Sequence, residues 1–248
     1  MAGYYALIGG SGLYQLEGIE NVRVIAVATP YGQTSADLVS ATWLGQPIVF
    51  LPRHGGKHEI PPHKINYRAN IWALKQQKVS HIISVNAVGG ISSEMAPGKL
   101  VIPDQIIDYS SGRDHTFFDG SVGVEHIDFT NPYDADLRQQ LVELGIRLEY
   151  DLVDGGTYAC TNGPRFESAG EIRKLGHDGC NIVGMTGMPE AALARELGIA
   201  YVSISVVVNW AAGVTREAIS MDHIMKTLHS GIDDVRRLLG NFFEKESV

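Results

Sequence analysis

The residues of this chain that are best suited to chemistry stand where apolar runs end. Arg53 and His54 follow one such run, Thr186 follows another, and Asn209 comes directly after Tyr201–Val208. In an open α/β sheet, ligands bind in the crevice outside the carboxyl ends of the strands. Thr186 and Asn209 are therefore expected to share one crevice. A guanidinium fork matches phosphate geometry, so Arg53 and His54 suit a bound oxyanion, although a solvated basic loop explains the pair equally well.

A glycine-rich turn, Gly9-Gly10-Ser11-Gly12, follows the apolar run Tyr4–Ile8. Its backbone N–H groups and the Ser11 hydroxyl could hold a single phosphate, or the glycines could serve only a tight turn. A dinucleotide-binding fingerprint is disfavoured, because Gln15 replaces the third glycine and Thr29-Pro30 stand where an acidic ribose ligand is needed.

The histidines at positions 54, 58 and 63 are not expected to bind a metal. Metal-binding imidazoles must be held rigidly, for instance at i and i+4 on a helix, and Gly55-Gly56 and Pro61-Pro62 prevent a continuous helix here. Cys160 and Cys180 form neither a CxxC pair nor a metal spacing and are expected to be reduced thiols. A cysteine hydrolase acting through Cys160 stays open, although no histidine is assigned beside it.

Phe166 and Glu167 lie between an apolar strand, Gly156–Cys160, and a helix expected at Ser168–Leu175. An acid there could simply be a first-turn residue favoured by the helix dipole, and the phenylalanine could belong to the core. The polar stretch between Asp108 and Asn131 is long for a loop of a compact domain, and such loops are usually functional or mobile.

Alternating apolar patterns predict an α/β arrangement of strands and helices. Strands are expected at Tyr4–Ile8, Val22–Ala28, Ile48–Pro52, His81–Val85, Leu100–Ile107, Gly156–Cys160, Ile182–Met185 and Tyr201–Val208. Helices are expected at Tyr67–Gln77, Asp134–Leu144, Ser168–Leu175, between Pro189 and Gly198, and from Ser220 onward.

The composition describes a single α/β domain spanning residues 1–248. The chain carries a formal net charge of −8, with 44% hydrophobic and 19% charged residues. A nucleic-acid partner is not expected, since phosphate neutralisation needs a basic face. No apolar stretch reaches membrane length, and the first residues lack the basic region of a signal peptide. We therefore expect a cytoplasmic protein with no nucleic-acid or membrane partner.

Together these strand ends resemble those of the nucleoside phosphorylases, in particular the trimeric branch that contains purine nucleoside and methylthioadenosine phosphorylases. The resemblance rests on the order and spacing of Gly9–Gly12, Arg53-His54, Asn86–Gly90, Gly163–Glu167, Gly184–Glu190 and Asn209. It implies a central mixed twisted β-sheet flanked by helices, and a homotrimer. It also implies phosphorolysis of a purine nucleoside to a free purine and a pentose 1-phosphate, with no metal or organic cofactor.

The resemblance also implies roles for single residues. Phosphate would be held by Ser11, Arg53, His54, Ala87 through its backbone, and Thr186. Met185 would lie against the ribose, Phe166 would stack near the base, and Glu167 and Asn209 would read the purine edge. Asn209, Glu167 and His54 would be the catalytic residues. Arg53→Ala is then expected to reduce phosphorolysis strongly without unfolding the protein.

The expected base is a 6-oxopurine. Phosphorylases for methylthioadenosine carry an Asp-x-Asp pair where this chain has Asn209-Trp210-Ala211, and a serine at the position of Glu167. An ionised Glu167 can accept a hydrogen bond from N1–H of hypoxanthine or guanine, whereas N1 of adenine is itself an acceptor.

The expected 5′ substituent is a methylthio group. Met221 stands where the inosine enzymes have a histidine for the 5′-hydroxyl, and Met225 lies one helical turn on, although both could instead join the helix core. In the related trimers a neighbouring subunit closes this pocket, and His126 is the candidate for that contribution. The expected substrate is 5′-methylthioinosine. The alternatives are inosine or guanosine, methylthioadenosine, and a non-catalytic nucleoside-binding protein.

Overall fold

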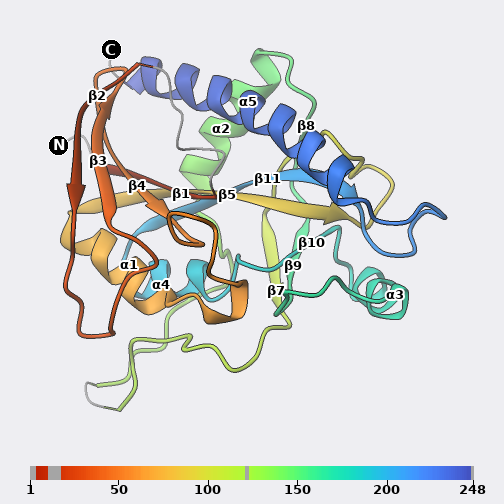
Figure 1. The fold of residues 1–248 in the computed structure, drawn as a ribbon, viewed down its shortest axis with the longest axis horizontal. Coiled ribbons are helices and arrows are strands. Elements are labelled where there is room, and N and C mark those ends of the chain that lie inside the picture. The colour runs from red at the N-terminus through yellow and green to blue at the C-terminus, as the bar shows by residue number, and fades with distance from the viewer. Residues whose placement is uncertain (1–3, 11–17, 121–122, 247–248) are drawn as a thin grey trace.

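A mixed β-sheet of eleven strands forms the centre of the computed structural model, which describes residues 4–10, 18–120 and 123–246 (Figure 1). The strands are β1 (Tyr4–Gly9), β2 (Ile19–Ile25), β3 (Leu38–Trp43), β4 (Gln46–Pro52), β5 (Val79–Gly90), β6 (Leu100–Ile102), β7 (Gln105–Asp108), β8 (Leu152–Asp154), β9 (Thr157–Cys160), β10 (Ile182–Gly184) and β11 (Ala200–Trp210). The main path runs β2-β3-β4-β1-β5-β10-β9-β7; β11 pairs with β5 and β6, and β8 with β6.

Helices cover both faces of this sheet. α2 (Ala135–Arg147) and α5 (Met221–Glu246) pack on one face, and α1 (Tyr67–Gln76) and α4 (Glu190–Glu196) on the other, while α3 (Ala169–His177) packs on β9 and β10 (Figure 1). The predicted mixed α/β sheet flanked by helices is therefore confirmed. Within the described residues, no helix is long and apolar enough to cross a membrane.

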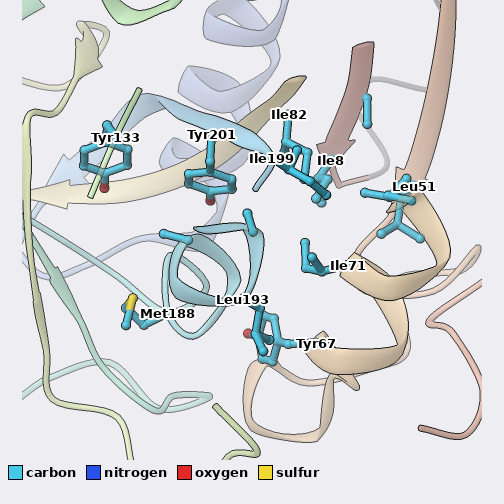
Figure 2. Packing of buried hydrophobic residues seen from close by; sticks show 14 of the residues in the cluster. Ile8, Leu51, Tyr67, Ile71, Ile82, Tyr133, Met188, Leu193, Ile199 and Tyr201 are labelled. Carbon is cyan, nitrogen blue, oxygen red and sulfur yellow. The ribbon is translucent and has the colours of Figure 1, made fainter. Parts of the chain in front are cut away.

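Two buried clusters hold these layers together. One joins α2 and α5 to the sheet and includes Val235 and Phe243, which are both fully buried. The other joins α1 and α4 to the opposite face. Figure 2 shows Ile71 and Leu193 from these helices packed in one cluster with Ile82 of β5. The sheet is thus buried on both sides, which accounts for the almost continuous apolar runs of its central strands.

β5 and β11 form the central parallel pair, and Asn86 and Asn209 lie near their carboxyl ends. They pair from His81 and Ala200 at one end to Gly90 and Trp210 at the other. The strand predicted at His81–Val85 therefore continues to Gly90, because β11 pairs with its polar end. The register shifts by one residue just before Asn209. Such a bulge bends a strand and re-aims the side chains beside it.

The predicted helix starts agree closely with the structure. Ser168 caps α3 in a capping box with Glu171, in which each side chain accepts from the backbone N–H of the other residue. The side chain of Asp134 likewise caps α2 by accepting from Leu137 N. Pro189, predicted as the first residue of a helix, instead occupies the N-cap of α4.

Two strand predictions need correction, and two strands of the sheet were not predicted. The strand predicted at Leu100–Ile107 is divided into β6 and β7 around Pro103, which cannot donate a ladder hydrogen bond. The strand predicted at Val22–Ala28 lies at Ile19–Ile25 on the sheet edge, where most of its side chains are exposed. β3 and the three-residue β8 were not predicted.

Candidate active site

One cavity of about 500 Å³ lies outside the carboxyl ends of the central strands and against the first turns of α5. It brings together ten of the predicted site residues from six separate segments: Arg53, His54, Ala87, Phe166, Glu167, Met185, Thr186, Asn209, Met221 and Met225. Ser11 lies outside the described residues, although neighbouring Gly10 lines the cavity. His126 is exposed in the segment between β7 and α2, and it is not among the residues that line the cavity of its own chain.

Arg53 reaches the cavity floor as a buried ion pair, not as a solvated basic residue. Its Nε and Nη2 donate to the two carboxylate oxygens of Glu190 at 2.7 and 2.9 Å, and the two side chains are 2% and 1% exposed. Nη2 also donates to Ser84 Oγ at 2.5 Å, and Nη1 to the carbonyl oxygen of Val85 at 3.2 Å. These bonds occupy four of the five guanidinium donors, so one N–H remains for a ligand.

The Glu190 carboxylate keeps the guanidinium of Arg53 positively charged. Burial by itself would lower the pKa of a guanidinium, but the Glu190 carboxylate outweighs this and raises the pKa of Arg53 above its ordinary value. Arg53→Ala is therefore expected to destabilise the fold as well as to reduce activity, because it leaves the buried Glu190 carboxylate without its partner.

A chain of buried hydroxyl and amide groups continues from this ion pair to Thr186. Ser84 Oγ donates to Glu190 at 2.9 Å, and the Asn86 amide donates to Ser84 Oγ at 3.4 Å and to Ser203 Oγ at 2.6 Å. Thr186 Oγ in turn donates to Asn86 Oδ1 at 2.8 Å. The chain fixes the side chain of Thr186 at the cavity wall. Low surrounding polarity makes such a network costly to break.

His54 is held as a neutral imidazole. Burial, followed by the positive charge of Arg53, lowers its pKa to about 4. Nδ1 lies 2.8 Å from the carbonyl oxygen of Ile60. A carbonyl can only accept, so Nδ1 carries the proton and Nε2 presents a lone pair. A hydroxyl on a bound oxyanion is therefore a suitable partner for Nε2.

Glu167 and Asn209 supply one carboxylate and one amide to the cavity wall. Thr161 Oγ donates to Glu167 Oε1 at 2.6 Å and orients the carboxylate. Nδ2 of Asn209 donates to the carbonyl oxygen of Trp210 at 2.7 Å, and its second N–H can serve a ligand. An acceptor and a donor thus line one cavity, together with the exposed ring of Phe166.

Met221 and Met225 do not belong to the core of α5. Their side chains are 56% and 43% exposed, whereas Ile224 and Ile232 on the same helix are buried. Both methionines line the cavity at its open side. The core-packing alternative for these two residues is therefore wrong, and the structure leaves an apolar rim that is open to solvent.

Several residues that organise the site have no predicted role of their own. Glu190 is predicted only as part of the Gly184–Glu190 motif, because an acid in the first turn of a helix needs no buried partner. A signal was present in the polar residues that interrupt apolar strands, Ser84 and Asn86 in β5 and Ser203 in β11. Arg113, in the polar stretch after β7, is also buried.

Cys160 is unsuited to be a nucleophile. Its side chain is fully buried, and burial raises the pKa of the thiol to about 12. We expect iodoacetamide at neutral pH to leave Cys160 unmodified and the activity unchanged, and to modify the residue once the protein is unfolded. Peptide mass spectrometry measures both. Rapid alkylation of the native protein with loss of activity would reinstate a cysteine mechanism.

No three His, Cys, Asp or Glu side chains of residues 4–10, 18–120 and 123–246 are grouped so that they could hold a metal ion. The cavity instead combines the buried Arg53–Glu190 ion pair, a wall with one carboxylate and one amide, and an apolar rim. These features suit a ligand that has an anionic part, a polar heterocycle and an apolar end.

Residues 4–244 match the sequence model of the phosphorylase superfamily. The chain belongs to this superfamily. Among its relatives, a protein of Pseudomonas syringae pv. tomato named probable S-methyl-5′-thioinosine phosphorylase is 49% identical over 95% of this chain and 96% of its own length. A probable 6-oxopurine nucleoside phosphorylase of Dictyoglomus turgidum is 44% identical over 97% of this chain and 90% of its own length.

Solved structures with the same fold include enzymes named for adenine nucleosides and not for 6-oxopurine nucleosides. A methylthioadenosine phosphorylase from an antarctic soil metagenomic library has a TM-score of 0.90 at 36% identity, covering 96% of this chain and 84% of that one. The methylthioadenosine phosphorylase of Schistosoma mansoni in complex with adenine has a TM-score of 0.88 at 32% identity, covering 96% and 90%. The fold alone therefore does not choose between 6-oxopurines and 6-aminopurines.

Proposed function

We propose that this protein cleaves the N-glycosidic bond of S-methyl-5′-thioinosine with phosphate, giving hypoxanthine and 5-methylthioribose 1-phosphate. One observation carries the proposal: the floor of Arg53, His54 and Thr186, the Glu167/Asn209 wall and the Met221/Met225 rim line a single cavity. The names of the relatives at 49% and 44% identity support the phosphorolysis of a 6-oxopurine nucleoside.

Each part of the cavity has a task in this reaction. Phosphate held by Arg53, His54, Thr186 and the backbone of Ala87 attacks the anomeric carbon and supports the positive charge that develops on the sugar. The amide of Asn209 donates to N7 or O6 of the departing purine, which becomes negative. Holding phosphate and nucleoside in one cavity supplies proximity as well.

The alternatives differ from this proposal at identifiable residues. A general enzyme for inosine or guanosine would need a polar partner for the 5′-hydroxyl, where this chain has exposed methionines. A methylthioadenosine enzyme would need a donor where Glu167 presents a carboxylate. A silent nucleoside-binding protein would have no need of the buried Arg53–Glu190 pair beneath its cavity.

A single assay tests the proposal. Purine release is measured with and without phosphate from methylthioinosine, inosine, guanosine and methylthioadenosine. We expect phosphate-dependent hypoxanthine release to be most efficient from methylthioinosine. Absence of phosphate-dependent release from all four nucleosides would refute phosphorolysis, and a preference for one of the other three would replace the substrate.

Met221→His is expected to shift activity from methylthioinosine towards inosine. Once the rim is covered by a neighbouring copy, as proposed below, a 5′-hydroxyl left unpaired against the methionines costs about 1–3 kcal/mol, and burying a methylthio group gains about 1 kcal/mol. The kcat/KM of the wild type should therefore be roughly tens-fold to hundreds-fold higher for methylthioinosine than for inosine. Comparison of kcat/KM for both nucleosides in wild type and variant measures the shift. Equal wild-type efficiency on the two would remove the proposed role of Met221.

We further propose that the enzyme works in the cytoplasm as a homotrimer, with no metal or organic cofactor. The exposed apolar rim of Phe166, Met221 and Met225 supports assembly, because a neighbouring copy would shield it from water. His126, exposed and away from its own cavity, would cover the rim of the next copy. The free thiols of Cys160 and Cys180 suit a reducing compartment. Light scattering of the purified protein measures the assembly.

A further inference from the structure

Arg113 is a buried arginine in a segment whose neighbours are largely exposed. It follows β7 and is 9% exposed, whereas Ser111, Gly112 and Asp114 beside it are exposed. Its guanidinium carbon lies 5.2 Å from the centre of the Tyr67 ring. The side chain therefore leaves the surface and enters the protein beneath the strand ends that form the cavity.

The guanidinium group of Arg113 connects two turns that are distant in sequence. Nη2 donates to the carbonyl oxygens of Thr161 and Asn162 at 3.1 Å each, and to that of Met185 at 2.9 Å. Nη1 donates to the carbonyl oxygen of Met188. The first two carbonyls belong to the turn after β9, and the last two to the turn after β10. One planar group thus holds both turns.

These two turns carry different parts of the cavity. The turn after β9 leads to Phe166 and Glu167, and the turn after β10 contains Met185 and Thr186. The hydrogen bond from Thr161 Oγ to Glu167, at 2.6 Å, links the first turn directly to the carboxylate. The separation of the two turns therefore sets how far Phe166 and Glu167 lie from Met185 and Thr186.

We propose that Arg113 is a positioning residue that holds the base-binding and phosphate-binding turns at their working separation. The proposal rests on the phosphorolysis proposed above. The segment that follows β7 then serves to place this guanidinium beneath the cavity. The same segment is bound to the turn after β9, since Ser111 N–H donates to Asn162 Oδ1 at 3.1 Å and Asn162 Nδ2 donates to Ser111 Oγ at 3.1 Å.

The geometry requires a guanidinium and not merely a positive charge. Four carbonyl oxygens lie around one edge of the planar group, and a lysine ammonium is a compact point charge that cannot reach both turns in a fixed fork. Loss of the fork lets the two turns move independently. Misplacement of reacting groups by about 1 Å costs about 10²-fold in rate.

The test compares Arg113→Ala and Arg113→Lys with a matched control, Arg138→Ala. Arg138 lies on α2 and donates to the carbonyl oxygens of Ile102 and Pro103 at 3.2 Å each. Among the described residues neither Arg138 nor these two partners line the cavity. The control therefore removes an arginine that also bridges carbonyl groups, but elsewhere in the fold.

In both Arg113 variants, kcat/KM for the nucleoside and kcat/KM for phosphate are each expected to fall by about 10²-fold. Methylguanidinium added to Arg113→Ala should partly restore both kcat/KM values, whereas added methylammonium should restore neither. Arg138→Ala should lose stability and keep its kinetic constants. Equal kinetics of Arg113→Ala and Arg138→Ala, loss for only one substrate, or rescue by both cations alike would overturn the proposal.

A second measurement does not depend on turnover. Hydrogen exchange of backbone amides in residues 161–167 and 184–188 should accelerate in Arg113→Lys and stay at the wild-type rate in Arg138→Ala. Unchanged exchange in both segments would overturn the positioning role even if Arg113→Ala failed to fold. A wild-type protein without phosphorolysis would refute the proposed function, while the exchange rates would still decide whether Arg113 holds the two turns.

Discussion

Arg53→Ala and Glu190→Gln are each expected to lower the free energy of unfolding by about 3–5 kcal/mol, because each leaves its partner's charge buried and unpaired. The two side chains are 2% and 1% exposed and are joined by paired hydrogen bonds of 2.7 and 2.9 Å. Urea unfolding at neutral pH measures the loss.

The matched control is the exposed pair of Arg165 and Glu171, whose side chains are 72% and 45% exposed. Such an exposed pair is screened by water and contributes little to stability, so Arg165→Ala should cost less than either variant of the buried pair. Similar losses for Arg53→Ala and Arg165→Ala would show that the buried pair does not form as described.

The double variant Arg53→Met with Glu190→Leu separates stability from phosphate binding. Replacing both members of a buried ion pair by apolar residues is often close to neutral, so the double variant should be more stable than either single variant. Phosphate should raise the melting temperature of the wild type, because it binds the folded state, and should have no effect on the double variant. Phosphate-dependent turnover in the double variant would reduce Arg53 to a structural role.

The location of the site could be predicted from the sequence because it follows from local patterns. A buried strand is readable as an apolar run, and the residue after it lies at the ligand-binding edge of the sheet. Arg53, Thr186 and Asn209 were placed by this rule, and the structure brings them to one cavity. The helix starts were predictable for the same reason, since a cap such as Ser168 acts on its own first turn.

The partners of the site residues could not be predicted in the same way. Glu190 is 137 positions from Arg53, and no local pattern marks a carboxylate that binds a residue so distant in sequence. Arg113 lies in a polar stretch, where composition predicts exposure, and its burial arises from carbonyl groups supplied by distant turns. The end of β5 was not predicted because Gly89 and Gly90 are typical of a turn, and their pairing with β11 on one side and β10 on the other keeps them in the strand.

The wild type is expected to prefer methylthioinosine to methylthioadenosine by at least roughly 10²-fold in kcat/KM. N1–H of hypoxanthine can donate to the Glu167 carboxylate, whereas N1 of adenine would place one acceptor against another. A site built for one edge leaves its buried groups unpaired when it receives the other. The solved phosphorylases named for methylthioadenosine share the fold at TM-scores of 0.90 and 0.88, so the choice of base must come from side chains.

Asn209→Asp should narrow this preference without reversing it. The new carboxylate can accept from the 6-amino group of adenine, but Glu167 still opposes N1 of that base.

Thr161→Val is the matched control: it removes the hydroxyl that donates to Glu167 Oε1 at 2.6 Å and leaves both base-reading residues in place. We expect it to lower kcat/KM for methylthioinosine while the order of the two substrates is kept. The measurement is kcat/KM of the wild type, Asn209→Asp and Thr161→Val for methylthioinosine and for methylthioadenosine. A wild type that favours methylthioadenosine, or an Asn209→Asp variant whose selectivity equals that of the wild type, would show that Glu167 and Asn209 do not read the purine edge.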